Sequence, residues 1–359
     1  AYIYDDFDIE GDAESVFALA DELSNATLGW RRKLRAGSEL TRLPAVQHRE
    51  ASRRGRARLS GRRHSVDRDR QAVTYHYDVS NDFYALWLGR RMIYSCAYFH
   101  SPTDALDTAQ EQKLDMICRK LRLKPGQRLL DIGCGWGGLV TFAAEHYGVA
   151  ATGITLSQPQ ASLANERIAN AKLSDRCRVL VQDYREVPTD GPERYDALVS
   201  VGMFEHVGAA KLPSYFVQAW KLLKPGGVFL NHGIAWRATD PVPSGTSFSE
   251  AYVFPDGELV PINITLHAAE ETGFEVRDVE SLREHYALTL RHWVRNLEAH
   301  HEQALQFVDE PTYRVWRLFM SGSAYGFSTG RTNLYQALLV KPDAEGRSGL
   351  PLTRADWYA

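Results

Sequence analysis

A glycine-rich loop is the strongest candidate for chemistry in this sequence. It spans 133–138 (GCGWGG) and directly follows the apolar run 128–132 (RLLDI). Glycines let the chain turn sharply and bring backbone N–H groups against a ligand at the N-terminus of a helix. The spacing fits a GxGxG loop for S-adenosylmethionine and, through Gly138, the GxGxxG loop of dinucleotide-binding folds. The loop alone therefore leaves both ligands open.

The acidic residues around the loop separate these two interpretations. A nicotinamide site expects an acid about 20 residues further on, to hold the ribose hydroxyls. That place reads 153–157 (GITLS), without an acid. Many methyltransferases also carry an acid there, so its absence does not decide. Asp131 before the loop and Asp183-Tyr184 further along fit the methyltransferase plan better, and we favour S-adenosylmethionine.

The elements that position these residues alternate between helix and strand from about residue 104. Apolar periodicity and turn residues predict helices over 107–121, 139–147, 158–171, 213–223 and 285–308, and strands over 128–132, 149–155, 177–182, 195–201, 228–232, 274–279 and 334–340. The alternation is typical of an α/β, doubly wound, Rossmann-like parallel sheet. Residues 236–262 interrupt it with proline, glycine and aromatic residues, which indicates an inserted helical lid or substrate loop.

Composition and charge exclude several classes of protein. The chain has 359 residues, of which 44% are apolar and 24% charged, which excludes a disordered or low-complexity protein. No apolar run approaches the roughly 20 residues that cross a bilayer. The net charge of −3 conceals an Arg-rich stretch, 31–70, with 14 basic and 4 acidic residues. We interpret this stretch as a mobile linker, either without a partner or attracted to an anionic surface, nucleic acid or acidic phospholipid.

The four cysteines lack the spacing of a metal site or a disulfide framework. None forms a CxxC pair or has a histidine at zinc spacing, so we predict no metal and expect a reducing, cytoplasmic setting. These residues are Cys96, Cys118, Cys134 and Cys177.

Further motifs, taken together, carry a family resemblance. They are 75–84 (YHYDVSNDFY), 94–99 (YSCAYF), 129–139 (LLDIGCGWGGL), 153–160 (GITLSQPQ), 182–187 (QDYREV), 201–208 (VGMFEHVG) and 223–234 (LKPGGVFLNHGI). In this order they resemble the cyclopropane-fatty-acyl-phospholipid synthase family, which includes mycolic acid cyclopropane synthases and methyltransferases that add branches to unsaturated acyl chains. The resemblance covers roughly 70–340 and implies the class I methyltransferase fold.

The resemblance also implies a domain organisation. Residues 1–30 resemble the tail of the family's small N-terminal domain, so we expect a segment to precede Ala1. The Arg-rich linker 31–70 would then lead into a methyltransferase domain over 71–345, with a C-terminal tail over 346–359.

By resemblance, one set of residues binds S-adenosylmethionine. Its members are Tyr94, Ser95, Asp131, Gly133, Gly135, Gly137, Thr155, Leu156, Gln160, Asp183 and Tyr184. Tyr94 and Ser95 are expected at the methionine end of the cofactor, and Asp183 and Tyr184 at its adenine. A Thr and Gln pair can hydrogen-bond the ribose hydroxyls, which would account for the missing acid.

A second set, again by resemblance, holds a bicarbonate ion that acts as base. Its members are Cys96, Glu205, His232, Ile234 and Tyr286. A base is needed because methyl transfer to an unactivated double bond leaves a carbocation, and proton loss from the new methyl closes the ring. Cys96 and the backbone at His232 and Ile234 would donate hydrogen bonds to the anion. Tyr286 would orient it, and Glu205 would accept its proton.

The leading hypothesis is an S-adenosylmethionine-dependent C-methyltransferase that acts on unsaturated phospholipid acyl chains. Its substrate would lie at an anionic membrane surface, so we expect a cytoplasmic enzyme attached peripherally to the inner face of the cell membrane. A cyclopropane product is favoured by family frequency, and a methylene-branched chain is the alternative. A homodimer is left open.

Two other functions are weaker. N-methylation of a small amine would not need the complete bicarbonate cage. Binding or modification of nucleic acid is disfavoured, because DNA amino-methyltransferases carry [DN]PP[YF] where this chain reads 202–205 (GMFE).

Overall fold

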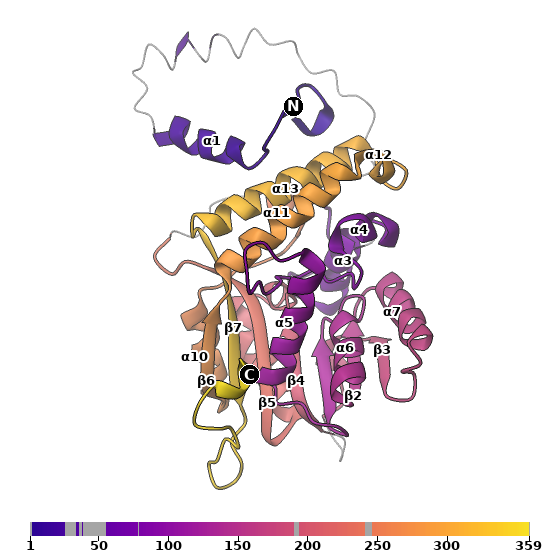
Figure 1. Ribbon diagram of the computed structural model, residues 1–359. Coiled ribbons are helices and arrows are strands. Elements are labelled where there is room, and N and C mark those ends of the chain that lie inside the picture. Colours follow the sequence, from indigo (N-terminus) through magenta and orange to yellow (C-terminus); the bar gives the residue numbers. More distant parts are fainter. Residues whose placement is uncertain are drawn as a thin grey trace.

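A seven-stranded sheet forms the centre of the computed structural model (Figure 1), which describes residues 2–25, 34, 35, 38, 55–77, 79–189, 194–240 and 246–358. Its strand order is β3-β2-β1-β4-β5-β7-β6. The strands are β1 (Arg128–Ile132), β2 (Ala150–Thr155), β3 (Cys177–Val181), β4 (Tyr195–Val201), β5 (Leu223–Trp236), β6 (Glu275–Ser281) and β7 (Thr332–Val340). Strands β1 to β5 are parallel, whereas β7 is antiparallel to both β5 and β6. The doubly wound α/β sheet is confirmed, with β7 as its reversed strand.

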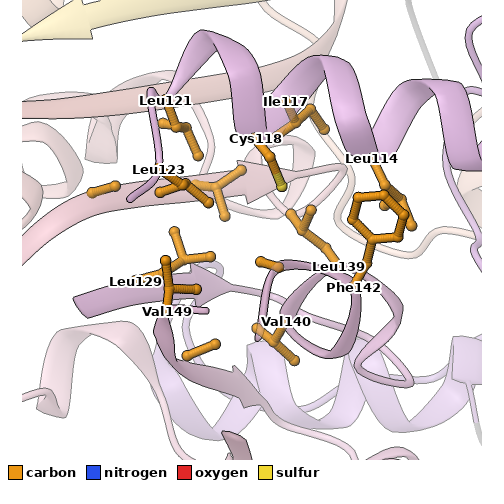
Figure 2. Close-up of a cluster of buried hydrophobic side chains, with 14 of the residues drawn as sticks. Leu114, Ile117, Cys118, Leu121, Leu123, Leu129, Leu139, Val140, Phe142 and Val149 are labelled. Carbon is orange, nitrogen blue, oxygen red and sulfur yellow. The ribbon is translucent and has the colours of Figure 1, made fainter. Parts of the chain in front are cut away.

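Helices cover both faces of the sheet. One face carries α5 (Leu106–Lys120), α6 (Gly138–Tyr147) and α7 (Gln158–Asn170), and the other carries α8 (Leu212–Leu222) and α10 (Ile262–Thr272). Successive residues of a strand point to opposite faces. Leu129 therefore belongs to the same hydrophobic cluster as Leu114 of α5 and Val140 of α6 (Figure 2), while Leu130 belongs to a cluster on the opposite face with Phe216 of α8.

A third, helical layer lies over the end of the sheet where β5 finishes (Figure 1). It consists of α3 (Val66–Tyr77), α4 (Asn81–Leu88), α9 (Phe248–Tyr252), α11 (Arg283–Ala299), α12 (His301–Ala304) and α13 (Glu310–Ser328). Its core is rich in aromatic side chains, among them the fully buried Trp87, Trp293 and Trp316. No helix among the described residues is both long and apolar enough to span a membrane.

Helix α13 has no counterpart among the predicted elements, and the helix predicted over 285–308 is divided. His300 adopts a non-helical backbone, so α11 ends there and the short α12 begins. The local signals for α13 are present, since Asp309 caps Thr312 at 3.0 Å and a proline follows in the first turn. Its apolar periodicity is broken by the buried Arg314 and Arg317, which obscures the helix in the sequence.

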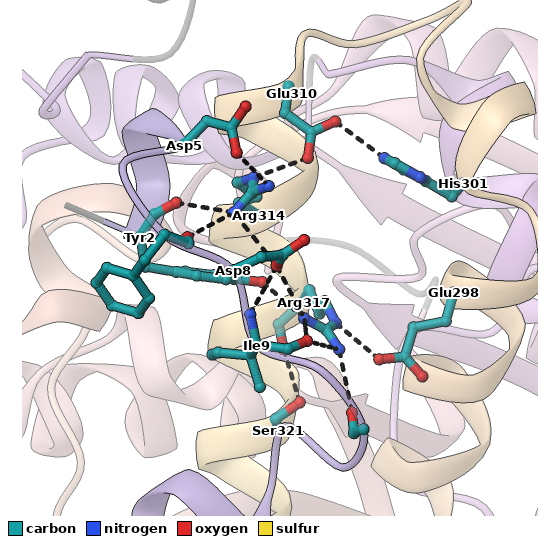
Figure 3. Close-up of polar contacts among 12 residues, drawn as sticks. Tyr2, Asp5, Asp8, Ile9, Glu298, His301, Glu310, Arg314, Arg317 and Ser321 are labelled. Atoms are coloured by element: carbon teal, nitrogen blue, oxygen red, sulfur yellow. Dashed lines mark hydrogen bonds and ion pairs between the residues drawn. The ribbon is translucent and has the colours of Figure 1, made fainter.

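These two arginines anchor the N-terminal segment to α13 (Figure 3). Arg314 donates hydrogen bonds of 3.2 Å to the carbonyl oxygens of Tyr2 and Phe7. Arg317 donates to the carbonyl oxygen of Ile9 at 3.3 Å and pairs with Glu298 of α11 at 2.7 Å. The segment that contains η1 (Tyr2–Tyr4) and α1 (Ser15–Asn25) is thereby held on the helical layer.

The predicted linker and tail are partly folded. The linker prediction is wrong from Val66 onward, because α3 begins there and buries Ala72 and His76. Before α3, the amide of Ala57 donates to the carbonyl of Ala251 in the insertion at 3.0 Å. Within 31–70, positions 31–33, 36, 37 and 39–54 lie outside the described residues. In the C-terminal tail, η5 (Ala355–Trp357) buries its tryptophan against the α5 side of the core.

Candidate active site

A cavity opens at the carboxyl ends of β1, β2 and β4, where the loop 133–138 enters α6. Its void space is about 1150 Å³, the open mouth included. All predicted cofactor residues except Asp131 and Gly137 line it: Tyr94, Ser95, Gly133, Gly135, Thr155, Leu156, Gln160, Asp183 and Tyr184. Ligands of doubly wound sheets bind at this edge, where strands of opposite winding direction part.

The three glycines of the loop serve different purposes. All have positive φ angles, between 55° and 83°. A Cβ on Gly133 would lie 2.5 Å from that of Met203, whereas a Cβ on Gly135 would meet no protein atom within 4 Å. Gly135 therefore leaves space for a ligand. Gly137 does not line the cavity, and a Cβ there would lie 3.1 Å from the Cβ of Ala164. Its role in the structure is to let α6 pack closely on α7.

Polar side chains also line the cavity, among them Thr155, Gln160, Asp183 and Arg185. The hydroxyl of Thr155 donates to Oε1 of Gln160 at 2.7 Å. The Nε2 of Gln160 is buried and has no hydrogen-bond partner among the described residues, so it is a donor suited to a ribose hydroxyl. Arg185 binds the carboxylate of Asp183 at 2.8 Å and that of Asp69 at 2.9 Å. This arginine therefore links the cavity wall to α3, which covers the cavity.

Lys113 of α5 also lines the cavity and was missed from the sequence. Its ammonium is buried and donates to the hydroxyl of Ser95 at 2.8 Å. Burial lowers the pKa of Lys113 to about 8 and raises the pKa of the nearby Asp131 carboxyl to about 7. Asp131 thus lies beneath the cavity rather than on its wall. The sequence gives little indication that Lys113 lines a cavity, because a lysine in an amphipathic helix is usually exposed to solvent.

None of the predicted cage residues lines this cavity. Glu205 stands in the turn η3 (Phe204–His206) that follows β4. Its Oε1 accepts a 2.7 Å hydrogen bond from the backbone N–H of Ile234, and its Oε2 is buried without a partner in the described part of the chain. Burial raises the pKa of Glu205 to about 7. The backbone N–H of Ile234, which was expected to donate to the anion, here donates to Glu205.

Cys96 and Tyr286 complete the same region. Cys96 is fully buried, with Sγ 3.1 Å from the carbonyl oxygen of Ala97, and burial raises the pKa of its thiol. The hydroxyl of Tyr286 interacts electrostatically with Cys96, Glu205 and Tyr77. Because Tyr77 also lines the cavity, it stands between the cavity and the cage.

His232 joins the cage from β5, two residues before Ile234 and on the same strand face. Its Nδ1 is 3.1 Å from the Nε2 of Gln336 on β7. Burial, together with the ammonium groups of Lys113 and Lys120, lowers the pKa of His232, so the imidazole is neutral.

Aromatic rings run between the two regions. The ring centroids of Tyr94, at the cavity, and Trp293 are 5.3 Å apart, and those of Trp293 and Tyr286 are 6.0 Å apart. Tyr77 meets Tyr94 edge-on at 6.2 Å. Such faces attract positive charge, most strongly in a site without water.

The sheet, the ligand cavity at its switch point and the glycine loop define a class I S-adenosylmethionine-dependent methyltransferase. The comparisons with known proteins identify the family within this class. Residues 64–337 match the model of the mycolic acid cyclopropane synthetase family, and the chain belongs to this family.

Named relatives and a solved structure agree with this assignment. A "probable fatty acid methyltransferase" of Pseudomonas putida is 49% identical over 300 residues, 83% of this chain and 76% of that protein. The cyclopropane-fatty-acyl-phospholipid synthase of Escherichia coli K12 is 36% identical over 266 residues, 74% of this chain and 66% of that protein. The crystal structure of mycolic acid cyclopropane synthase CmaA1, complexed with SAH and CTAB, superimposes with a TM-score of 0.70. It is 34% identical, covering 75% of this chain and 97% of that one.

Proposed function

We propose that this methyltransferase alkylates the double bond of an unsaturated phospholipid acyl chain and forms a cyclopropane. The observation that carries the proposal is the buried carboxyl of Glu205, which has one unpartnered oxygen close to Tyr286. Transfer of a methyl group to an amine would not need the complete set of cage residues around this carboxyl, since a lone carboxylate can serve such a reaction as its base. The relationship to a cyclopropane-fatty-acyl-phospholipid synthase supports the same substrate class.

The cavity fits S-adenosylmethionine, which when bound would supply the methyl group from its sulfonium. Gly135 leaves room for close approach, and the Nε2 of Gln160 would donate to a ribose hydroxyl. Lys113 fixes the hydroxyl of Ser95 at the end of the cavity assigned to methionine. Tyr94, which lines the cavity and packs against Trp293, would face positive charge that develops on the acyl chain.

The cage fits a small anion that carries a proton of its own, and bicarbonate when bound there would take the proton released on ring closure. The buried thiol of Cys96 and the hydroxyl of Tyr286 keep their protons, since burial raises the pKa of both groups. Both groups are therefore donors, and the thiol of Cys96 would turn from the carbonyl oxygen of Ala97 to reach the anion. The unpartnered Oε2 of Glu205 is the acceptor for the anion's own proton.

A methylene-branched chain is the second candidate product. The relative with 49% identity is named only as a fatty acid methyltransferase, a name that covers either product, whereas identity to the cyclopropane synthase is 36%. Both products begin with the same methyl transfer and differ in the carbon that loses the proton.

The membrane part of the proposal rests on charge. The stretch 31–70 carries a net charge of +10 and would attract anionic headgroups at the inner face of the cell membrane. Arg58 and Arg62 of this stretch are exposed.

The deciding experiment is proton NMR of lipids from a host that makes monounsaturated chains and expresses the protein. Upfield ring protons are expected, whereas vinylic signals would establish the methylene product and absence of both would overturn the proposal.

Glu205→Gln and Cys96→Ser should lose most turnover yet bind S-adenosylhomocysteine normally. Cys177→Ser, which alters a buried cysteine on β3, is the matched control and should remain active.

A further inference from the structure

A chain of buried polar side chains leads from the predicted cage to the edge of the sheet. The Nε2 of Gln336 lies 3.1 Å from Nδ1 of His232, and Oε1 of Gln336 lies 2.7 Å from Nζ of Lys120. Lys120 also pairs with Glu280. His232 and Glu280 are the cross-strand neighbours of Gln336, on β5 and β6 respectively. His232, Gln336 and Lys120 are each only 1% exposed, whereas Glu280 reaches the surface.

The hydrogen-bonding capacity of each group fixes the direction of this chain. An ammonium has only donors, so Lys120 must be met by the oxygen of the Gln336 amide. The NH₂ group of the same amide then faces His232. A donor at this place requires Nδ1 of the neutral imidazole to be the acceptor, and the ring proton consequently lies on Nε2.

The Nε2–H group so defined is buried and has no hydrogen-bond partner among the residues that the structure describes. A buried N–H without an acceptor is costly, and native structures rarely keep one without a purpose. Nδ1 is engaged toward β7, so Nε2 points away from that strand. His232 lies on the same face of β5 as Ile234, whose backbone N–H binds Glu205. The ammonium of Lys113, which holds Ser95 next to Cys96, also lowers the pKa of the His232 ring, so the ring lies on the side of β5 that carries the cage.

We propose that Lys120 and Gln336 are positioning residues that hold His232 as the Nε2–H tautomer, so that its imidazole donates a hydrogen bond to the anion in the cage. The inference rests on the proposed function only for the identity of the anion as bicarbonate. The tautomer itself follows from the hydrogen bonds alone.

Lys120→Met tests this assignment with little change in side-chain volume. Without the ammonium, the NH₂ group of Gln336 gains a better partner in the carboxylate of Glu280, its neighbour across the strands. The amide would then turn its oxygen toward His232. Nδ1 becomes the protonated nitrogen, and Nε2 presents a lone pair that repels an anion.

Two measurements test the assignment. The tautomer is measured by NMR on the protein with S-adenosylhomocysteine bound, and the use of bicarbonate is measured by steady-state kinetics. Ring ¹⁵N NMR of histidine-labelled protein reports the tautomer, and the signals of His232 are assigned by their loss in His232→Asn. In parallel, turnover is measured against added bicarbonate in carbon-dioxide-depleted buffer. We expect Nε2–H in the native protein and Nδ1–H in Lys120→Met. Loss of a donor to a charged group should raise the KM for bicarbonate by about tenfold to a hundredfold, with kcat at saturation nearly unchanged.

Lys341→Met is the matched control, because it removes another buried ammonium, one that binds the carbonyl oxygens of Trp220 and Leu223 instead. It should leave both the tautomer and the KM unchanged. If Lys120→Met does not fold, Gln336→Met takes its place, and a mixture of tautomers is expected.

An Nδ1–H tautomer in the native protein, or a tautomer that Lys120→Met leaves unchanged, would overturn the inference. So would a changed tautomer with an unchanged KM for bicarbonate. Turnover in the native protein that needs no bicarbonate would instead contradict the proposed base, while the NMR result for His232 would stand on its own.

Discussion

The ammonium of Lys113 and the hydroxyl of Ser95 are joined by a 2.8 Å hydrogen bond at the wall of the cofactor cavity. This contact links α5 to the segment that carries Tyr94 and Cys96. Tyr94 lines the cavity, and Cys96 belongs to the predicted cage. Asp131, at the end of β1, is the nearby acid that offsets the buried charge of Lys113. A single lysine thus connects the glycine loop, the cavity and the cage electrostatically.

The first prediction concerns this buried pair. Lys113→Met should destabilise the fold by about 1 to 3 kcal/mol, because the buried Asp131 carboxyl, whose pKa is already raised to about 7, loses a nearby positive charge and must take up a proton. Adding Asp131→Asn should recover a large part of the loss. Urea unfolding of both single variants and the double variant measures the coupling. Strictly additive losses would show that the two groups do not interact.

The second prediction concerns Gly135, whose absent side chain leaves the cavity open. Gly135→Val should weaken S-adenosylhomocysteine binding at least tenfold, measured by calorimetry, because the new side chain fills ligand space and strains a φ of +55°. Gly126→Val is the matched control. Gly126 also has a positive φ and open space around it, but it lies in the turn before β1. Equal losses of affinity in both variants would assign the effect to backbone strain.

The third prediction is a pH dependence of stability. Burial raises the pKa of Glu205 to about 7 from its ordinary 4.5, so the folded state holds this proton more tightly than the unfolded chain. Ionisation therefore opposes folding, and this contribution to the free energy of unfolding falls as pH rises through 4.5 to 7. Glu205→Gln removes the effect. Its stability relative to the native protein should rise by about 2 kcal/mol between pH 5 and pH 8. A constant difference in the free energy of unfolding between Glu205→Gln and the native protein across this pH range would contradict the raised pKa.

Short buried strands could be predicted closely from the sequence. The predicted bounds of β1 and β4 match the structure residue for residue, because each is a brief apolar run that ends at a turn. The cavity residues could likewise be found, since the glycine loop places them at adjacent strand ends. Strand β5 begins earlier than expected because residues 224–227 form an irregularity in its pairing with β4.

Other features depend on contacts that no local pattern records. The pairing of His232 with Gln336 requires the register of two strands about 100 residues apart. The buried Lys113 and Lys120 occupy helix positions that a lysine normally exposes. Arg314 and Arg317 similarly disguise α13, because their partners lie at the other end of the chain.

The fourth prediction concerns the cover of the cavity. Asp69 of α3 pairs with Arg185 of the cavity wall at 2.9 Å. Asp69→Asn should weaken this link, raise the Kd for S-adenosylhomocysteine several-fold and speed amide hydrogen exchange in α3. Asp67→Asn is the matched control, since Asp67 lies on the same helix but is 90% exposed and, among the residues that the structure describes, pairs only with Arg70. Loss of affinity in Asp67→Asn alone would contradict the role of the Asp69 link.

The fifth prediction tests the attraction of the Arg-rich stretch to lipid. Arg58 and Arg62 are exposed, and each basic charge near an anionic membrane contributes about 1 kcal/mol. The double charge reversal to glutamate should therefore reduce sedimentation with anionic liposomes by tenfold or more at low salt. The difference should shrink near about 0.5 M salt, where charges are screened within a few ångströms. Reversal of Arg176 and Arg178, which are exposed but lie at β3, is the control and should have a much smaller effect. If the two double reversals reduce binding equally, net charge rather than the stretch 31–70 governs attraction to the membrane. If neither reduces binding, the stretch is a connector without a lipid partner.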